Sequence, residues 1–329
     1  MKITKAIEGY IIDCRTRGRS GKTIIWYEQK LNSFAKWLDE EEDTQHLERV
    51  TIVHLRSFVL YLQSEPAGRR AVNKGNGGNP VKISALTIKG YVQVIKGFFS
   101  WCLEEELIEK DPSKRLKLPS VPDYMIPTFT PEHIRLMLDV CDLSTTLGYR
   151  DYTIILVLLE TGIRVSELCG LETQDVFEDH IRVFGKGKKE REVGISPQVA
   201  KQLWKYVNHY RKPADENEQR IFINRYGQPV TPNGVEQLLV DVKNKAGITG
   251  VRVSAHTFRH TFARMYLEQG GEIYKLSRLM GHSSVEVTEE YLKDFKLRAA
   301  RQEQGKFSPV NALDLLGKNK KRRGKDRPS

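Results

Sequence analysis

The sequence is poor in features of membrane or secreted proteins. Its 329 residues contain no apolar run near the roughly 20 residues that cross a bilayer. The N-terminus reads MKITKAIEGYIIDC, with an acid at Glu8 and no long apolar segment before a cleavage site, so we expect no signal peptide. The four cysteines are far apart and form no C-x-x-C pair: Cys14, Cys102, Cys141 and Cys169. This argues against a disulfide framework or zinc ribbon and favours buried thiols in a cytoplasmic protein.

Acidic residues are too few to balance the basic ones. The chain has 53 Lys and Arg against 42 Asp and Glu, a net charge of +11. From Lys318 to the end, seven basic residues face Asp326 alone, whereas residues 121–317 are balanced at 26 each. The overall charge therefore suits a polyanionic partner without identifying one, and local motifs must supply the specific argument.

The first third of the chain predicts an all-helical domain. Apolar side chains recur at helical spacing over residues 23–39, 51–65 and 84–106, and no strand pattern competes with them. Residues 67–80 (AGRRAVNKGNGGNP) are rich in glycine and asparagine and predict a loop with basic residues. We expect this N-terminal domain to span residues 1–117.

Prolines predict the boundary between two domains. Residues 118–129 contain Pro119, Pro122 and Pro127 and show no helical period. Because proline removes a backbone donor and disfavours helix in the preceding residue, this stretch predicts an extended linker. After it, Thr130-Pro131-Glu132 has the N-cap, first-turn proline and acid that begin a helix.

The second domain, residues 130–302, is predicted to be mainly helical with a small antiparallel sheet. Residues 152–161 are densely apolar and predict a buried helix, while 174–182 and 192–195 predict short strands around a Gly-Lys turn. Further helices are expected over residues 197–210, 231–246, 256–270, 272–280 and 285–296. Residues 303–329 form a C-terminal segment and basic tail.

Two clusters of this domain combine cations with tight turns. In Thr161–Leu168 (TGIRVSEL), Arg164 follows a glycine and opens a helix. An arginine beside an apolar helix is costly to bury unless it binds an anion or pairs, here with Glu167, and both readings stay open. In Phe184–Arg191 (FGKGKKER), Lys186 between two glycines could approach a phosphate closely, or the run is a solvated basic hairpin.

Two further clusters contain histidines. On a helix, His256, Arg259 and His260 of SAHTFRH fall at positions i, i+3 and i+4 and can share one face. The H-x-x-x-H spacing occurs in helical zinc sites, but Thr257 replaces their glutamate and Arg259 would repel a cation. An imidazole beside a guanidinium suits an anionic substrate better. In LMGHSSVEVTEEYL, His282 precedes Tyr291, which alone would be an ordinary half-buried aromatic residue.

Together the four clusters resemble, in order and spacing, the active-site motifs of the tyrosine recombinases, the lambda-integrase and Xer-like family. The family's T-G-x-R-x-S-E-L, G-K-G, H-x-x-R and L-G-H motifs and its nucleophile are matched by Arg164, Lys186, His256 with Arg259, His282 and Tyr291. The resemblance covers roughly residues 20–300. Met280 replaces the usual leucine, and the loop at 67–80 is longer than a minimal member needs, but neither departure touches a catalytic position.

The resemblance implies a site-specific DNA recombinase that works through a 3′-phosphotyrosine intermediate. Tyr291 would be the nucleophile, and Arg164 and Arg259 would hold the non-bridging phosphate oxygens where other nucleases use a metal ion. The covalent ester stores the energy of the broken bond, so no cofactor, metal or ATP is expected. The N-terminal part would be the family's SAM-like core-binding domain, and the partners would be duplex DNA and further copies of the chain in a tetramer.

The remaining residues complete this chemistry. His256 is the candidate base, because the hydroxyl of a free tyrosine has a pKa near 10 and needs help to ionise. His282 would donate a hydrogen bond to the phosphate, and Lys186 would protonate the leaving 5′ oxygen.

Two other functions compete with recombination. A type IB topoisomerase resembles the family in its active site, although the N-terminal helical domain favours recombination. A catalytically silent DNA-binding regulator is the second alternative, and the full set of catalytic residues argues against it. We also expect residues 307–316 to dock on a neighbouring protomer or to pack on their own domain, and residues 318–327 to contact DNA non-specifically.

Overall fold

The chain forms two compact units in the computed structural model. The structure describes residues 1–64, 82–121, 127–185 and 189–281. The division lies between Met1–Tyr124 and Met125–Ser329, and each unit is described by itself. The residue limits expected from the sequence for the two domains and the linker between them remain predictions.

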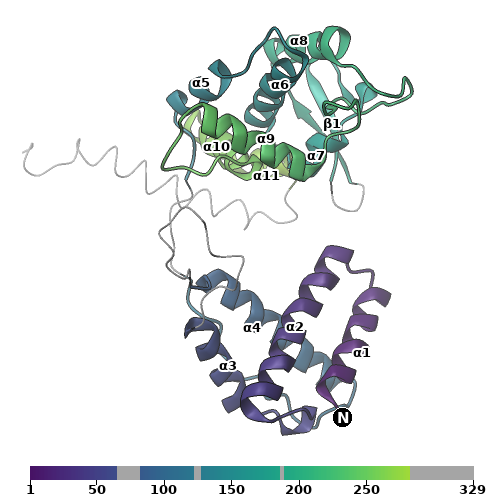
Figure 1. The fold of residues 1–329 in the computed structure, drawn as a ribbon, viewed down its shortest axis with the longest axis vertical. Helices are drawn as coiled ribbons and strands as arrows, with labels where there is room; N and C mark the ends of the chain where they lie inside the picture. Colours follow the sequence, from purple (N-terminus) through teal and green to yellow (C-terminus); the bar gives the residue numbers. More distant parts are fainter. Residues whose placement is uncertain (65–81, 122–126, 186–188, 282–329) are drawn as a thin grey trace, which may run out of the picture. The chain divides into compact units, whose positions relative to one another are not determined.

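The described part of the N-terminal unit is helical (Figure 1). Its helices are α1 (Ile3–Thr16), α2 (Gly21–Glu42), the 3₁₀ turn η1 (Leu47–Arg49), α3 (Ile52–Ser64) and α4 (Ala85–Glu104). Three of these match the predicted helices, and two of them begin at serine caps, since Ser20 and Ser84 accept hydrogen bonds from the backbone N–H groups of Thr23 and Thr87. Helix α1 was not predicted, and it begins without a capping side chain.

Aromatic side chains dominate the core of this unit. Helices α1, α2 and α4 pack against one another, and α3 packs on α2 and α4. Phe34 and Phe58 are fully buried with ring centroids 5.0 Å apart, and Tyr10 lies 5.4 Å from Trp101 across α1 and α4. Such ring pairs add to the large apolar area that each aromatic residue buries.

The described part of the second unit contains helices and a two-stranded sheet. Its helices are α5 (Pro131–Asp139), α6 (Thr146–Thr161), α7 (Val165–Gly170), α8 (Pro197–Lys205), α9 (Pro232–Lys245), α10 (Ala255–Glu268) and α11 (Ile273–Met280), with a 3₁₀ turn η2 (Thr173–Asp175) and a π-helical turn η4 (Tyr206–Tyr210). Strands β1 (His180–Phe184) and β2 (Glu190–Gly194) pair antiparallel, with Val183 opposite Arg191.

The first strand begins later than predicted. We expected strand from residue 174, but η2 and a bend occupy the chain until His180. The reason is Asp175, whose carboxylate accepts a hydrogen bond from the Glu172 backbone N–H and two from Arg182, which fixes a turn there. The helix predicted over residues 197–210 is confirmed as α8, which is followed by the π-helical turn η4.

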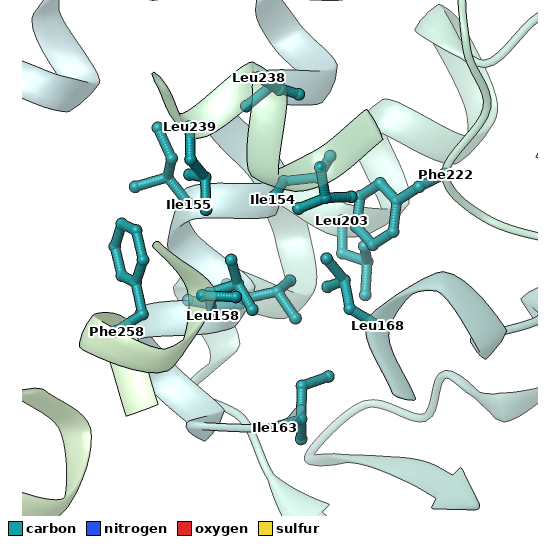
Figure 2. Packing of buried hydrophobic residues seen from close by; sticks show 14 of the residues in the cluster. Ile154, Ile155, Leu158, Ile163, Leu168, Leu203, Phe222, Leu238, Leu239 and Phe258 are labelled. Carbon is teal, nitrogen blue, oxygen red and sulfur yellow. The ribbon is translucent and has the colours of Figure 1, made fainter. Parts of the chain in front are cut away.

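Helix α6 lies at the centre of the core of the second unit. It packs against α10, α8 and η4, and Ile154, Ile155 and Leu158 are fully buried (Figure 2). This confirms the buried helix predicted over residues 152–161. This packing positions the C-terminal end of α6 at Thr161, three residues before Arg164.

The fold class is confirmed: a mainly helical chain with an all-helical N-terminal domain and a mostly helical second domain that holds a small antiparallel sheet. Among the described residues, no helix has both the length and the apolar character to cross a membrane. All four cysteines are free, and the predicted burial is confirmed for three of them, whereas Cys169 is half-buried.

Candidate active site

The site begins where helix α6 ends. Gly162 terminates α6 with a left-handed backbone (φ 58°), and a Cβ added there would lie 2.4 Å from the Phe262 ring. Only glycine fits this position, because both the backbone conformation and the close approach of α10 exclude a side chain. The sharp turn carries the chain through buried Ile163 to Arg164, which begins α7.

Arg259 reaches this turn from α10. Its side chain is buried, with the residue only 5% exposed, and its Nη1 donates to the Gly162 carbonyl at 2.7 Å. Its Nη2 donates to the Met280 carbonyl at 2.5 Å. A buried guanidinium is tolerated when hydrogen bonds replace its water, and these two bonds place the cation between the ends of α6 and α11.

Arg164 lies at the surface of the same turn. Its Nη1 donates to the Glu167 carboxylate at 2.9 Å, and its Nη2 donates to the Gly281 carbonyl at 2.9 Å. Its side chain remains 40% exposed. The pairing with Glu167 considered from the sequence is therefore real, and the exposed face of the guanidinium still leaves room for an anion.

Glu167 joins Arg164 to a cation that the sequence reasoning did not single out, Arg191. The buried carboxylate accepts from the Arg164 backbone N–H, the Arg164 side chain, and both Nη atoms of Arg191 at 2.9 and 2.8 Å. Burial acts to raise the pKa of Glu167, but the hydrogen bonds from Arg191 and Arg164 outweigh it and hold the pKa below its usual value. The alternation of side chains along a strand could have identified Arg191, because it places Arg191 on the same face of β2 as buried Val193.

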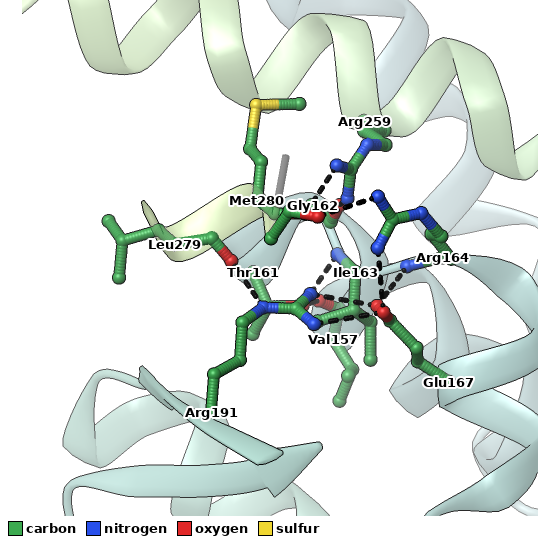
Figure 3. Close-up of polar contacts among 11 residues, drawn as sticks. Val157, Thr161, Gly162, Ile163, Arg164, Glu167, Arg191, Arg259, Leu279 and Met280 are labelled. Atoms are coloured by element: carbon green, nitrogen blue, oxygen red, sulfur yellow. Dashed lines mark hydrogen bonds and ion pairs between the residues drawn. The ribbon is translucent and has the colours of Figure 1, made fainter. Parts of the chain in front are cut away.

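Three arginines from three elements meet at the C-terminal end of α11. The carbonyls of Leu279, Met280 and Gly281 accept hydrogen bonds from Arg191, Arg259 and Arg164 respectively (Figure 3). The last carbonyls of a helix lack partners within the helix and carry the negative end of its dipole, so cations bind there favourably. The network thereby fixes the chain at Gly281, the residue directly before His282.

His256 and His260 lie one turn apart on α10, as predicted from their spacing. Their Nε2 atoms are 2.6 Å apart, and His256 is exposed whereas His260 is buried. Desolvation lowers the pKa of His256, and the positive charges of Arg259 and Arg252 lower it further. The lowered pKa favours the uncharged imidazole, the form that can accept a proton.

The structure describes three of the six predicted catalytic residues. Arg164 and Arg259 bond to adjacent carbonyls at the end of α11, and His256 lies three residues before Arg259 on α10. Lys186, His282 and Tyr291 lie outside the described residues. Gly185 and Lys189, which border residues 186–188, are described: the Gly185 backbone N–H donates to the Lys189 carbonyl at 2.8 Å.

Comparison with known proteins shows the class to which this fold and site belong. Residues 127–298 match the phage integrase family, and residues 7–75 match the phage integrase N-terminal SAM-like domain. The chain therefore belongs to the phage integrase family, and the resemblance noted from its motifs is confirmed.

Individual relatives give the same result. The chain is 32% identical over 276 residues to tyrosine recombinase XerC of Bacillus licheniformis, covering 82% of this chain and 84% of that protein. It is 31% identical over 297 residues to tyrosine recombinase XerD of Staphylococcus haemolyticus, covering 89% and 94%. Its fold is similar to a XerH site-specific recombinase bound to a palindromic difH substrate, at a TM-score of 0.67 and 20% identity, covering 87% of this chain and 80% of that one.

Proposed function

We propose that this protein is a site-specific DNA recombinase that cleaves and rejoins duplex DNA through a 3′-phosphotyrosine intermediate. The observation that carries the proposal is the convergence of Arg164 and Arg259 at one end of α11, with Arg164 still exposed. Two guanidiniums side by side suit a phosphodiester, because each can donate to non-bridging oxygens that gain charge in the transition state.

The reaction is a transesterification at phosphorus. The Tyr291 hydroxyl oxygen attacks the scissile phosphate and forms a phosphotyrosine bond, while the bond from phosphorus to the 5′ oxygen breaks. His256 takes the tyrosine proton, and Lys186 gives a proton to the leaving 5′ oxygen. His282 donates a hydrogen bond to the phosphate. The reverse reaction, with a 5′ hydroxyl as the attacking group, rejoins the strand without metal or ATP.

The relatives favour recombination over the two alternatives. The XerC and XerD proteins are named as recombinases and align over most of their length, and residues 7–75 of this chain match the SAM-like domain. A XerH and a lambda integrase have been captured on DNA. By extension, we assign residues 1–117 to core binding and 130–302 to catalysis, joined by the linker at 118–129, with a tetramer assembled on DNA in the cytoplasm.

The decisive experiment is capture of the covalent intermediate. Wild-type protein incubated with a nicked suicide substrate in EDTA should give a protein–DNA band on a denaturing gel, and Tyr291→Phe should abolish it with DNA binding retained. Tyr274→Phe, which alters an exposed tyrosine on α11, is the matched control and should leave the band unchanged. An adduct that persists in Tyr291→Phe would assign the nucleophile elsewhere, and an absolute magnesium requirement would contradict the mechanism.

A further inference from the structure

Arg191 connects three elements of the catalytic unit. It lies on β2, opposite Val183 of β1, and its side chain is only 14% exposed. Both Nη atoms donate to Glu167 of α7, at 2.9 and 2.8 Å, and Nε donates to the Leu279 carbonyl of α11 at 2.7 Å. All three nitrogens of this guanidinium are thus engaged, two by the carboxylate that holds Arg164 and one by the end of α11 (Figure 3).

The last turn of α11 also rests directly on this guanidinium. Gly281 has a left-handed backbone (φ 62°), and a Cβ added there would lie 2.9 Å from Arg191 Nη1 and 3.0 Å from Cζ. The backbone of residue 281 therefore contacts Arg191 with no space for a side chain between them. Arg191 contributes both a hydrogen bond and a packing surface to the position from which the chain continues to His282.

We propose that Arg191 is a positioning residue for strand cleavage: through Glu167 it orients the guanidinium of Arg164, and through Leu279 and Gly281 it sets the path of the chain into His282. The inference rests on the proposed function, because it assigns Arg191 a role in that same reaction. In this scheme Arg191 itself is assigned no contact with the substrate, and it acts through the residues that it holds.

Loss of Arg191 has a defined physical consequence. The Glu167 carboxylate would keep only its two contacts with Arg164, and the Leu279 carbonyl would lose a donor. The space under Gly281 would open, which frees the end of α11 to shift. Because a misplacement of about 1 Å can cost about 10²-fold in rate, we expect Arg191→Ala to slow cleavage about 10- to 100-fold at unchanged DNA affinity.

The chain offers a matched control in Arg182. It lies on the partner strand, on the other face of the hairpin, and its Nε and Nη2 both donate to Asp175, whose side chain is 3% exposed. Glu167 is buried to the same degree, at 2%. Arg182→Ala therefore removes the partner of an equally buried carboxylate without touching Arg164 or α11, and it reports the purely structural cost.

The experiment measures single-turnover cleavage on pre-bound suicide DNA, together with DNA affinity and thermal unfolding. We expect Arg191→Ala and Arg182→Ala to lower the unfolding temperature similarly, with only Arg191→Ala slowing cleavage. Arg191→Lys, which keeps a charge but cannot form the two-bond contact, should lose rate to an intermediate degree, and it serves as the test if Arg191→Ala does not fold. Equal rate losses for the Arg191 and Arg182 variants, or full activity in both Arg191 variants, would overturn the proposal.

A double-mutant cycle separates this inference from the proposed function. If Arg191 acts through Arg164, then Arg191→Ala should cost clearly less rate in an Arg164→Ala background than in the wild type. Fully additive losses would disprove the link to Arg164 while leaving the recombinase assignment intact. If Arg164→Ala itself cleaved at the wild-type rate, the proposed catalytic role of Arg164 would fail instead.

Discussion

The two units bury charge in opposite ways. Among the Asp, Glu, His, Lys and Arg side chains in the described part of the N-terminal unit, Lys30 alone is buried. Its ammonium lies over the rings of Tyr91 and Trp26, 3.7 and 4.9 Å from their centroids. In the described part of the second unit, Glu167, Asp175, Arg259 and His260 are all buried. Of these, Glu167 and Asp175 are held by arginines, and Arg259 is bound to backbone carbonyls.

The difference is that buried charge destabilises the N-terminal unit, whereas in the second unit it positions the residues of the proposed active site. Lys30 is held by ring faces, and burial lowers its pKa, so its charged form is a cost to the N-terminal unit. In the second unit the buried carboxylates pair with arginines, and Arg259 bonds to carbonyls at the ends of α6 and α11, an arrangement that the proposed chemistry needs. Variants of the arginines that bond to the ends of α6 and α11 should therefore alter the cleavage rate, whereas the Lys30 variant should alter stability alone.

The largest effect should come from the proton donor of the catalytic unit. If Lys186 protonates the leaving oxygen, Lys186→Ala should slow cleavage of normal DNA about 10²- to 10⁴-fold. On DNA with a bridging 5′ sulfur, which leaves without a proton, the variant should approach the wild-type rate. Equal defects on both substrates would reduce Lys186 to a phosphate contact and pass the acid role to Lys188 or Lys189.

The next effect concerns the buried cation Arg259. Arg259→Ala should slow single-turnover cleavage about 10²- to 10³-fold, or about 3–4 kcal/mol of barrier, because a charge contact to the phosphate oxygens is lost. Arg259→Lys keeps the charge but cannot bond to both carbonyls in the same way. Its cleavage rate should lie between those of the wild type and Arg259→Ala. A rate within twofold of wild type in the folded Ala variant would remove Arg259 from catalysis and would break the contrast with Lys30.

A smaller effect appears in the pH dependence of stability. Because the folded-state pKa of Glu167 is lowered, its contribution is present above the usual value of 4.5 and is lost as pH falls through the folded pKa. In Glu167→Gln the free energy of unfolding should therefore fall less steeply as the pH is lowered. The slope should decrease by at most about 1.4 kcal/mol per pH unit. Urea unfolding between pH 3 and pH 7 measures this. Glu132→Gln, which removes an exposed carboxylate on α5, should leave the slope unchanged; an unaltered slope in Glu167→Gln would contradict the prediction.

The smallest effect is expected in the N-terminal unit. Lys30→Met should raise the free energy of unfolding by up to about 1 kcal/mol, since methionine keeps the apolar stem and removes the buried charge. The folded-state pKa of Lys30 is lowered, so the advantage should be full at neutral pH and should shrink as pH rises toward 10.5. Lys36→Met, an exposed position on α2 paired with Glu40, is the control. A destabilised Lys30→Met would show that the cation–π contacts outweigh burial.

Local pattern was enough for most of the elements. The helices α2, α3 and α4 follow apolar spacing, and Thr130 caps α5 as the Thr-Pro-Glu sequence predicts. Two elements were not predicted correctly, the helix α1 and the start of β1. Helix α1 carries a regular apolar face, from Ile3 and Ile7 to Ile11, but has no capping side chain to mark its start. The late start of β1 depends on Asp175 bonding to Arg182, a contact that periodicity does not encode.

The sequence by itself determined the family, through the order and spacing of motifs that begin with the Arg164 segment and end at Tyr291. Those motifs are short and contiguous, so chemistry and spacing can be read without a fold. The tertiary structure decided how the cations are held. Arg164 bonds to Gly281, 117 residues away, Arg259 bonds to Gly162, 97 away, and Arg191 bonds to Leu279, 88 away. Contacts between such distant residues leave no periodic trace in the chain, and they exist because α6 and α10 pack together and bring the end of α11 beneath three guanidiniums.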